Sequence, residues 1–212
     1  MKMNLPNKLS VLRLIMVPIF MVVMLLPVFT SFSETADMIL TLVGAFLFIA
    51  ASITDMLDGK IARKYNLVTD FGKFIDPLAD KFMVIGAMFC ILFTSKDNLV
   101  MFTILFFALL IVVFREMAVT SIRLVAVSGK ERVVIAANML GKMKTVMQII
   151  AICAAILEPI IYAALGNFIT VPQWLTAYPP LTIATMALMT YLTIHSGINY
   201  IVGAWKYLDP QK

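Results

Sequence analysis

Four aspartates at two helical spacings are the residues of this sequence best suited to chemistry. Asp55 and Asp58 are three positions apart, and Asp76 and Asp80 are four apart. On a helix, each spacing places both carboxylates on one face, where like charges repel. A charge at the centre of a membrane helix also costs about 2.5 to 3.5 kcal/mol on insertion scales. We therefore expect a cationic partner that offsets the four negative charges.

A divalent metal ion is the partner that these side chains suit best. The ligands are oxygen atoms, with no His or Cys nearby, which favours Mg²⁺ or Mn²⁺ over Zn²⁺. We predict Asp55, Asp58, Asp76 and Asp80 as metal ligands, enough for two ions. A solvated acidic loop is the alternative, and the ordered spacing argues against it.

Small and basic residues between the aspartates indicate a ligand that carries phosphate. Gly59 and Gly72 remove side chains beside the acidic faces, so a bulky ligand can approach the backbone. Arg63 offers a planar fork of donors that matches a phosphate group. Metal ligands, glycines and arginine together point to a diphosphate.

These residues form one pattern, which reads Asp55-x2-Asp58-Gly59-x2-Ala62-Arg63-x8-Gly72-x3-Asp76-x3-Asp80. At every fixed position the pattern resembles the signature of the CDP-alcohol phosphotransferases. The resemblance implies an integral membrane enzyme that moves a phosphatidyl or similar group from a CDP-activated donor to an alcohol and releases CMP. Gly59, Ala62, Arg63 and Gly72 would then line the CDP site. We assign Asp80 as the general base as well, because it ends the motif and shares a helix face with Asp76.

The composition excludes a soluble globular protein. Of 212 residues, 62% are hydrophobic and 14% charged, and the mean hydropathy is +0.98. We expect an all-α integral membrane protein with one domain over residues 1–212. Six apolar stretches are long enough to cross a bilayer; they are residues 14–32, 37–54, 82–95, 98–122, 143–165 and 181–205. The third span begins earlier, near Phe71, if its helix carries Asp76 and Asp80.

Basic residues indicate how the spans are oriented. In this topology all of the 17 Lys and Arg residues except Lys96 fall on one side of the membrane. The positive-inside rule then places both termini and the acidic motif on the cytoplasmic side of the cell membrane. The formal charge of +5 faces anionic lipid headgroups, and we expect no nucleic-acid partner.

A short interfacial helix is expected before the first span. Asn7 or Ser10 would cap it, and Lys8 and Arg13 would face the headgroups. This helix would lie flat on the membrane surface.

Further cations are expected to hold a second anionic group. Arg115 lies deep in the fourth span, and an intramembrane arginine indicates function. Its neighbour Glu116 is not expected to pair with it, because adjacent helix positions do not face each other. Arg123, Lys142 and Lys144 border the next cytoplasmic connection, and with Arg115 they are our candidates for the phosphate of the acceptor.

Flanking segments resemble one branch of the family, the bacterial phosphatidylglycerophosphate synthases. The segments are Asn7-x-Leu9-Ser10-x2-Arg13, Arg115-Glu116 and Gly141-Lys142-x-Lys144-Thr145. This resemblance implies CDP-diacylglycerol and sn-glycerol 3-phosphate as substrates, phosphatidylglycerophosphate and CMP as products, and a homodimer among membrane lipids.

Other functions remain open at this stage. The acceptor could be serine, inositol phosphate or phosphatidylglycerol. An intramembrane prenyltransferase also holds diphosphate with aspartates, but its two acidic motifs lie far apart in sequence. A divalent-cation transporter would carry acidic residues near mid-span, whereas these gather at one membrane surface.

Overall fold

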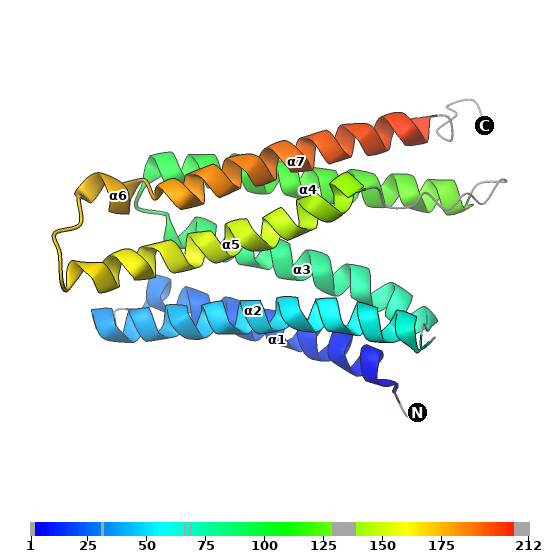
Figure 1. Ribbon diagram of the computed structural model, residues 1–212, viewed down its shortest axis with the longest axis horizontal. Coiled ribbons are helices and arrows are strands. Elements are labelled where there is room, and N and C mark those ends of the chain that lie inside the picture. Colours follow the sequence, from blue (N-terminus) through cyan, green and yellow to red (C-terminus); the bar gives the residue numbers. More distant parts are fainter. Residues whose placement is uncertain (1–2, 31, 66, 68, 129–138, 206–212) are drawn as a thin grey trace.

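The computed structural model is a bundle of long helices that run side by side along one axis (Figure 1). It describes residues 3–30, 32–65, 67, 69–128 and 139–205, and only the backbone of residues 62, 63 and 126–128. Every regular element in these ranges is a helix; they are α1 (Leu5–Phe29), α2 (Glu34–Lys64), α3 (Asp70–Thr94), α4 (Leu99–Ser128), α5 (Met139–Gly166), α6 (Gln173–Ala177) and α7 (Pro180–Ala204).

Six helical segments among the described residues are long and apolar enough to cross a membrane. The expected all-α fold with six spans is confirmed, and the chain is a multi-pass membrane protein. The third span begins at Asp70, one residue before the expected Phe71, and carries both Asp76 and Asp80. The second helix continues to Lys64, so it also carries Asp55 and Asp58.

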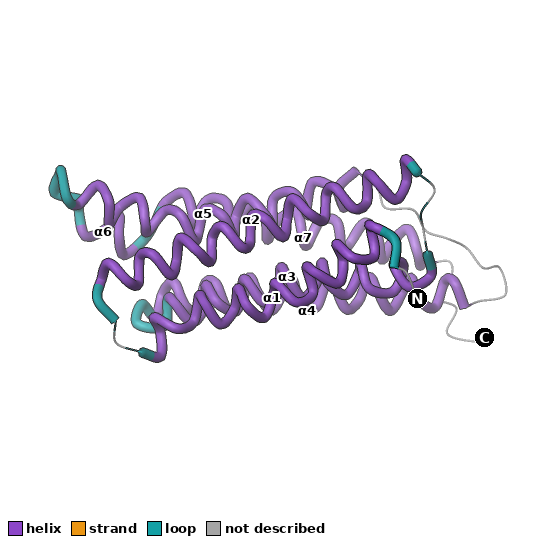
Figure 2. The backbone as a smooth tube through the Cα atoms, turned by 90° about the horizontal axis from the view of Figure 1, so that it is seen from below, coloured by secondary structure: helices purple, strands orange, loops and turns teal. Residues whose placement is uncertain are grey.

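The contacts between the helices divide them into two groups. The connections between helices lie at the two ends of the bundle (Figure 2). α1 packs against α2 and α3, while α7 packs against α4 and α5, and contacts of α3 with α4 and α5 join the groups. The core between them holds Phe20, Phe48, Met83, Ile152 and Met186, all fully or almost fully buried.

Capping residues set where two of the helices begin. The side chain of Asn4 accepts a hydrogen bond from the Asn7 amide, and Pro6 lies in the first turn of α1, where it needs no donor. Thr69 caps α3 by accepting from the Gly72 amide at 3.0 Å. Both caps lie close to the acidic motif.

The expected interfacial helix is not a separate element. α1 runs without a break from Leu5 to Phe29, and its cap is Asn4 rather than Asn7 or Ser10. A continuous helix satisfies every interior amide of this segment except at proline, whereas a break inside the membrane would leave some unpaired. The residues assigned to a surface helix therefore enter the bundle.

The acidic motif and the basic residues predicted to bind the acceptor lie toward one end of the bundle, here called the motif end. There α1, α3 and α5 begin and α2, α4 and α7 end, and α6 lies at the opposite end (Figure 1). Lys96, the basic residue set apart from the others by sequence, lies at the α6 end, where it donates to the Val28 carbonyl oxygen at 3.1 Å.

Candidate active site

The four aspartates of the motif line one cleft at the motif end, with a volume of about 420 Å³. Asp55 and Asp58 come from the last turns of α2, and Asp76 and Asp80 come from the first turns of α3. The two acidic faces predicted from spacing therefore face each other across the cleft. Two antiparallel helices joined by residues 65–69 bring this about.

Gly59 and Gly72 also line the cleft, as predicted. A Cβ atom on Gly72 would lie 3.1 Å from Asn7 Oδ1 and 3.3 Å from Thr69 Oγ1, closer than side chains ordinarily pack. Glycine at this position therefore lets α1 approach the start of α3. The lack of a side chain at Gly72 therefore permits close packing of the cleft wall and also leaves room for a ligand in the cleft.

Ala62 and Arg63 lie in the last turns of α2, but their side chains lie outside the described part of the chain. Their expected contacts with CDP stay predictions.

Arg13 is at the centre of the acidic cluster, where sequence reasoning did not place it. Its guanidinium is fully buried, and Nη1 lies 2.5 Å from both Asp55 Oδ1 and Asp80 Oδ1. Nη2 contacts Asp58 Oδ2. The expectation that Arg13 faces lipid headgroups is wrong, because α1 enters the bundle and turns this residue toward α2 and α3.

Two other polar residues on the same face of α1 contact the motif. Ser10 Oγ lies 2.6 Å from Asp76 Oδ1, and Asn7 Oδ1 accepts from the Thr69 hydroxyl at 2.9 Å. Asn7, Ser10 and Arg13 are spaced three apart, which marks one helix face. That spacing, inside an apolar stretch, is the sequence signal that could have identified α1 as the third wall of the site.

The chemistry of the cleft fits a divalent cation. Among the described residues, no three Asp, Glu, His or Cys side chains are gathered as a ready-made metal site, and Arg13 lies between three of the aspartates. Arg13 offsets one of the four carboxylate charges, and Lys60 and Lys73 also line the cleft, although Lys73 pairs with Asp70. The aspartates therefore keep a smaller excess of negative charge. The Asp55 and Asp80 side chains remain 30% and 48% exposed, so both can take a ligand from the cleft. Oxygen donors with an excess of negative charge suit Mg²⁺ or Mn²⁺.

A basic cluster, formed by Arg115 and Lys144 around Glu116, lies beside the acidic one. Glu116 on α4 accepts from Arg115 Nη1 at 3.0 Å and also from Lys144 Nζ on α5. The expectation that Arg115 and Glu116 do not pair is wrong, because the Arg115 side chain is long enough to turn its guanidinium to the neighbouring carboxylate. Glu116 thus holds two cations in place at the junction of two helices.

The four predicted acceptor residues differ in how free their charges are. Lys144 is buried and bound to Glu116, and Arg115 is largely buried with it. Arg123 is exposed with its guanidinium 6.0 Å from the ring centre of Tyr200, and Lys142 is exposed at the start of α5. Only the latter two therefore present accessible side chains.

Lys81 joins the two clusters and was not among the predicted site residues. It follows Asp80 on α3, and its Nζ donates to the Thr120 hydroxyl on α4. It lies close enough to Arg115, Glu116 and Arg123 to interact with their charges. Its position directly after a motif aspartate is the signal that could have marked it.

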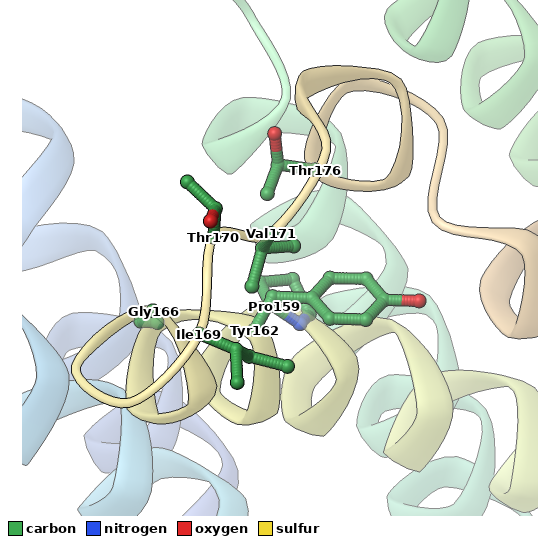
Figure 3. A pocket seen from close by; sticks show the side chains of 8 residues that line it. Pro159, Tyr162, Gly166, Ile169, Thr170, Val171 and Thr176 are labelled. Atoms are coloured by element: carbon green, nitrogen blue, oxygen red, sulfur yellow. The ribbon is translucent and has the colours of Figure 1, made fainter.

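A second cavity, of about 360 Å³, lies at the α6 end (Figure 3). Pro159, Tyr162 and Gly166 of α5 line it, with the connection to α6 and Thr176 on its other side. None of the described residues that line it carries a charge. It therefore has none of the charged groups that catalysis at a diphosphate would need.

The fold and site define a class: a multi-pass helical membrane protein with an acidic cleft and a basic cluster at one end. A model of the CDP-alcohol phosphatidyltransferase family matches residues 3–205, and the chain belongs to this family of enzymes. The resemblance seen in the sequence motif is thereby confirmed.

Bacterial relatives cover nearly the whole chain. A protein of Bacillus subtilis is 40% identical over 208 residues, which is 97% of each chain. One of Rickettsia felis is 34% identical over 208 residues, with 96% of this chain and 97% of the relative covered. One of Haemophilus influenzae is 30% identical over 197 residues, with 93% and 96% covered. All three are named CDP-diacylglycerol–glycerol-3-phosphate 3-phosphatidyltransferase.

Proposed function

We propose that this enzyme transfers the phosphatidyl group of CDP-diacylglycerol to sn-glycerol 3-phosphate, with phosphatidylglycerophosphate and CMP as products. The observation that carries the proposal is the convergence of four carboxylates from α2 and α3 on one cleft. The names and full-length similarity of the bacterial relatives support the choice of acceptor.

Charge neutralisation and positioning are the main tasks in transfer at a phosphorus centre. Asp55, Asp58, Asp76 and Asp80 would hold one or two Mg²⁺ or Mn²⁺ ions, which supply positive charge to the diphosphate when bound. Gly59 and Gly72 leave room beside these carboxylates for CDP. Ala62 and Arg63, in the last turns of α2, are proposed to complete the nucleotide site.

Asp80 is proposed as the general base. Its side chain is half exposed to the cleft, so the hydroxyl of an acceptor can come within hydrogen-bond distance. The carboxylate takes the proton of this hydroxyl. The hydroxyl oxygen of the acceptor attacks the phosphorus atom bonded to the diacylglycerol. The bond from that phosphorus to the CMP oxygen breaks, and CMP leaves with the electron pair.

The four predicted acceptor residues are proposed to orient the phosphate of the acceptor. Arg123 and Lys142 present accessible charges, while Arg115 and Lys144 would act from their pairs with Glu116. Lys81 directly follows Asp80 on α3 and donates to Thr120 on α4, so it would hold a positive charge between the phosphate of the acceptor and the base.

The motif end is proposed to face the cytoplasm at the cell membrane. The concentration of Lys and Arg at this end supports this orientation, which also gives access to soluble sn-glycerol 3-phosphate. The acyl chains of the donor would remain among the apolar helices. A homodimer, implied by the family resemblance, stays a prediction that light scattering of the purified protein in detergent can test.

The direct test is CMP release by purified enzyme in vesicles that contain labelled CDP-diacylglycerol. Each acceptor is supplied separately: sn-glycerol 3-phosphate, serine, inositol phosphate and phosphatidylglycerol. We expect turnover with sn-glycerol 3-phosphate, and its loss in EDTA with recovery on addition of Mg²⁺ or Mn²⁺. Preferential turnover with another acceptor would refute the proposed substrate, and full turnover in EDTA would refute the metal.

A further inference from the structure

We infer that Arg13 is a positioning residue that acts as an internal counter-ion: it neutralises the motif aspartates in the metal-free enzyme and weakens their binding of divalent cations. The inference rests on the proposed function, because it concerns the metal proposed for this cleft. Arg13 belongs to α1, outside the motif on α2 and α3.

The geometry shows one cation shared by three carboxylates. Nη1 of Arg13 lies 2.5 Å from Asp55 and 2.5 Å from Asp80, and Nη2 contacts Asp58. These aspartates come from two helices, so the guanidinium ties α2 to α3. Asp76, the fourth aspartate, binds Ser10 instead of Arg13.

Burial makes this charge dependent on its partners. The Arg13 side chain is fully buried, and its Nε has no hydrogen-bond partner among the described residues. A guanidinium stays protonated in proteins, so it cannot avoid burial by losing its charge. Three carboxylates without a cation would repel one another in the same way. Each side therefore stabilises the other.

Arg13 reaches the carboxylates from the α1 side and leaves the cleft open. All four aspartates line the cleft, whereas Arg13 and Ser10 are not among the residues that line it. A divalent cation arriving through the cleft meets carboxylates that already share a positive charge. The two cations must repel, and each must weaken the other's hold on the same oxygens.

Linkage determines the direction of the effect. If Arg13 weakens metal binding, the metal must weaken the contribution of Arg13 to stability by the same factor. Removing the charge should therefore tighten metal binding by about 5- to 150-fold, the usual range for coupled sites. It should also make the metal-free protein less stable while the metal-bound protein changes little.

The experiment compares wild type with Arg13→Met, which keeps much of the side-chain volume and removes the charge. Electron paramagnetic resonance measures Mn²⁺ affinity, and the thermal midpoint is measured in EDTA and in saturating Mn²⁺. We expect tighter Mn²⁺ binding and a drop in midpoint that is much larger in EDTA. If the variant folds in neither buffer, Arg13→Gln, which keeps a donor for one carboxylate, replaces it.

Ser10→Ala is the matched control, because Ser10 lies on the same face of α1 and contacts Asp76 without carrying charge. Because it removes a hydrogen bond from a proposed metal ligand but no charge, it should not tighten Mn²⁺ binding, and its midpoint should fall no further in EDTA than in Mn²⁺. Weaker Mn²⁺ binding by Arg13→Met, or an equal loss of stability in both buffers, would overturn the inference and leave the proposed metal intact. Absence of Mn²⁺ binding by wild type would overturn both.

Discussion

The two ends of the bundle hold their carboxylates in opposite ways. At the α6 end, Glu158 on α5 is 4% exposed and accepts hydrogen bonds from the Leu181 amide at 3.1 Å and the Tyr162 hydroxyl at 2.7 Å. The Thr182 amide and hydroxyl donate to it at 2.6 and 2.7 Å. α7 begins after Pro179 with no side-chain cap of its own, so Glu158 supplies the cap from another helix.

At the motif end, three of the four carboxylates share one buried guanidinium, the fourth binds Ser10, and all four line a cleft. Glu158 is saturated by fixed neutral donors, so it has little capacity left for a ligand. The motif aspartates keep an excess of negative charge beside Lys60 and Lys73, so they retain capacity for a cation. Burial of an acidic residue therefore does not identify a site in this protein; the balance between charge and fixed partners does.

Replacing Asp58 should have the largest effect on turnover, in contrast to any replacement at the α6 end. Asp58→Ala removes the most buried aspartate of the cluster, and we expect no measurable CMP release, because the remaining oxygens no longer match the charge and geometry of the metal. Turnover is measured at limiting and at saturating Mg²⁺. Asp70→Asn is the control, since Asp70 is 98% exposed on α3 and pairs only with Lys73 among the described residues. Near-wild-type activity of Asp58→Ala at limiting Mg²⁺ would contradict the assignment.

Asp80 separates binding from chemistry within the acidic cluster. Asp80→Asn keeps the size of the side chain but cannot take a proton, so we expect kcat to fall by roughly 10² to 10⁴ fold. Affinity for CDP-diacylglycerol should change little, and equilibrium binding measures it. If nucleotide or metal binding falls as far as in Asp58→Ala, while kcat recovers at saturating metal, then Asp80 serves only as a metal ligand and the base assignment is wrong.

Variants of the predicted acceptor residues should have a smaller effect on turnover, limited to binding of the acceptor. Arg123→Ala and Lys142→Ala each remove an accessible charge, and we expect the KM for sn-glycerol 3-phosphate to rise about tenfold, as for loss of one charged hydrogen bond. Binding of CDP-diacylglycerol should persist. Lys144→Ala should raise the same KM and also lower the thermal midpoint, since it leaves Glu116 with one cation fewer. An unchanged KM in all three variants would mean that these residues serve only membrane topology.

Glu158 should have the smallest effect on turnover. Glu158→Ala leaves the Thr182 and Leu181 donors unpaired, and we expect a loss of stability of about 1 to 3 kcal/mol. The thermal midpoint records this loss, and kcat per folded enzyme should equal that of wild type. A specific defect in catalysis without a change in midpoint would show that the α6 end takes part in the reaction.

Much of this protein follows from sequence alone. Apolar runs of membrane length determine the six spans, because each span must satisfy its backbone hydrogen bonds within itself. The spacing of Asp55, Asp58, Asp76 and Asp80 determines that each pair shares a helix face, because helical periodicity is local. The signature around them determines the family, which the full-length match to residues 3–205 confirms.

Tertiary structure alone decided which charges meet. By sequence, Arg13 was expected to face lipid headgroups and Lys144 to bind the phosphate of the acceptor. Both are buried, one against three motif aspartates and the other against Glu116. Their partners lie 28 or more positions away in sequence, and no local rule links such residues. Packing of α1 against α2 and α3, and of α4 and α5 at the same end, turns these side chains inward. Long-range packing, which sets the distance between charges on different helices, therefore decided the electrostatics of the site.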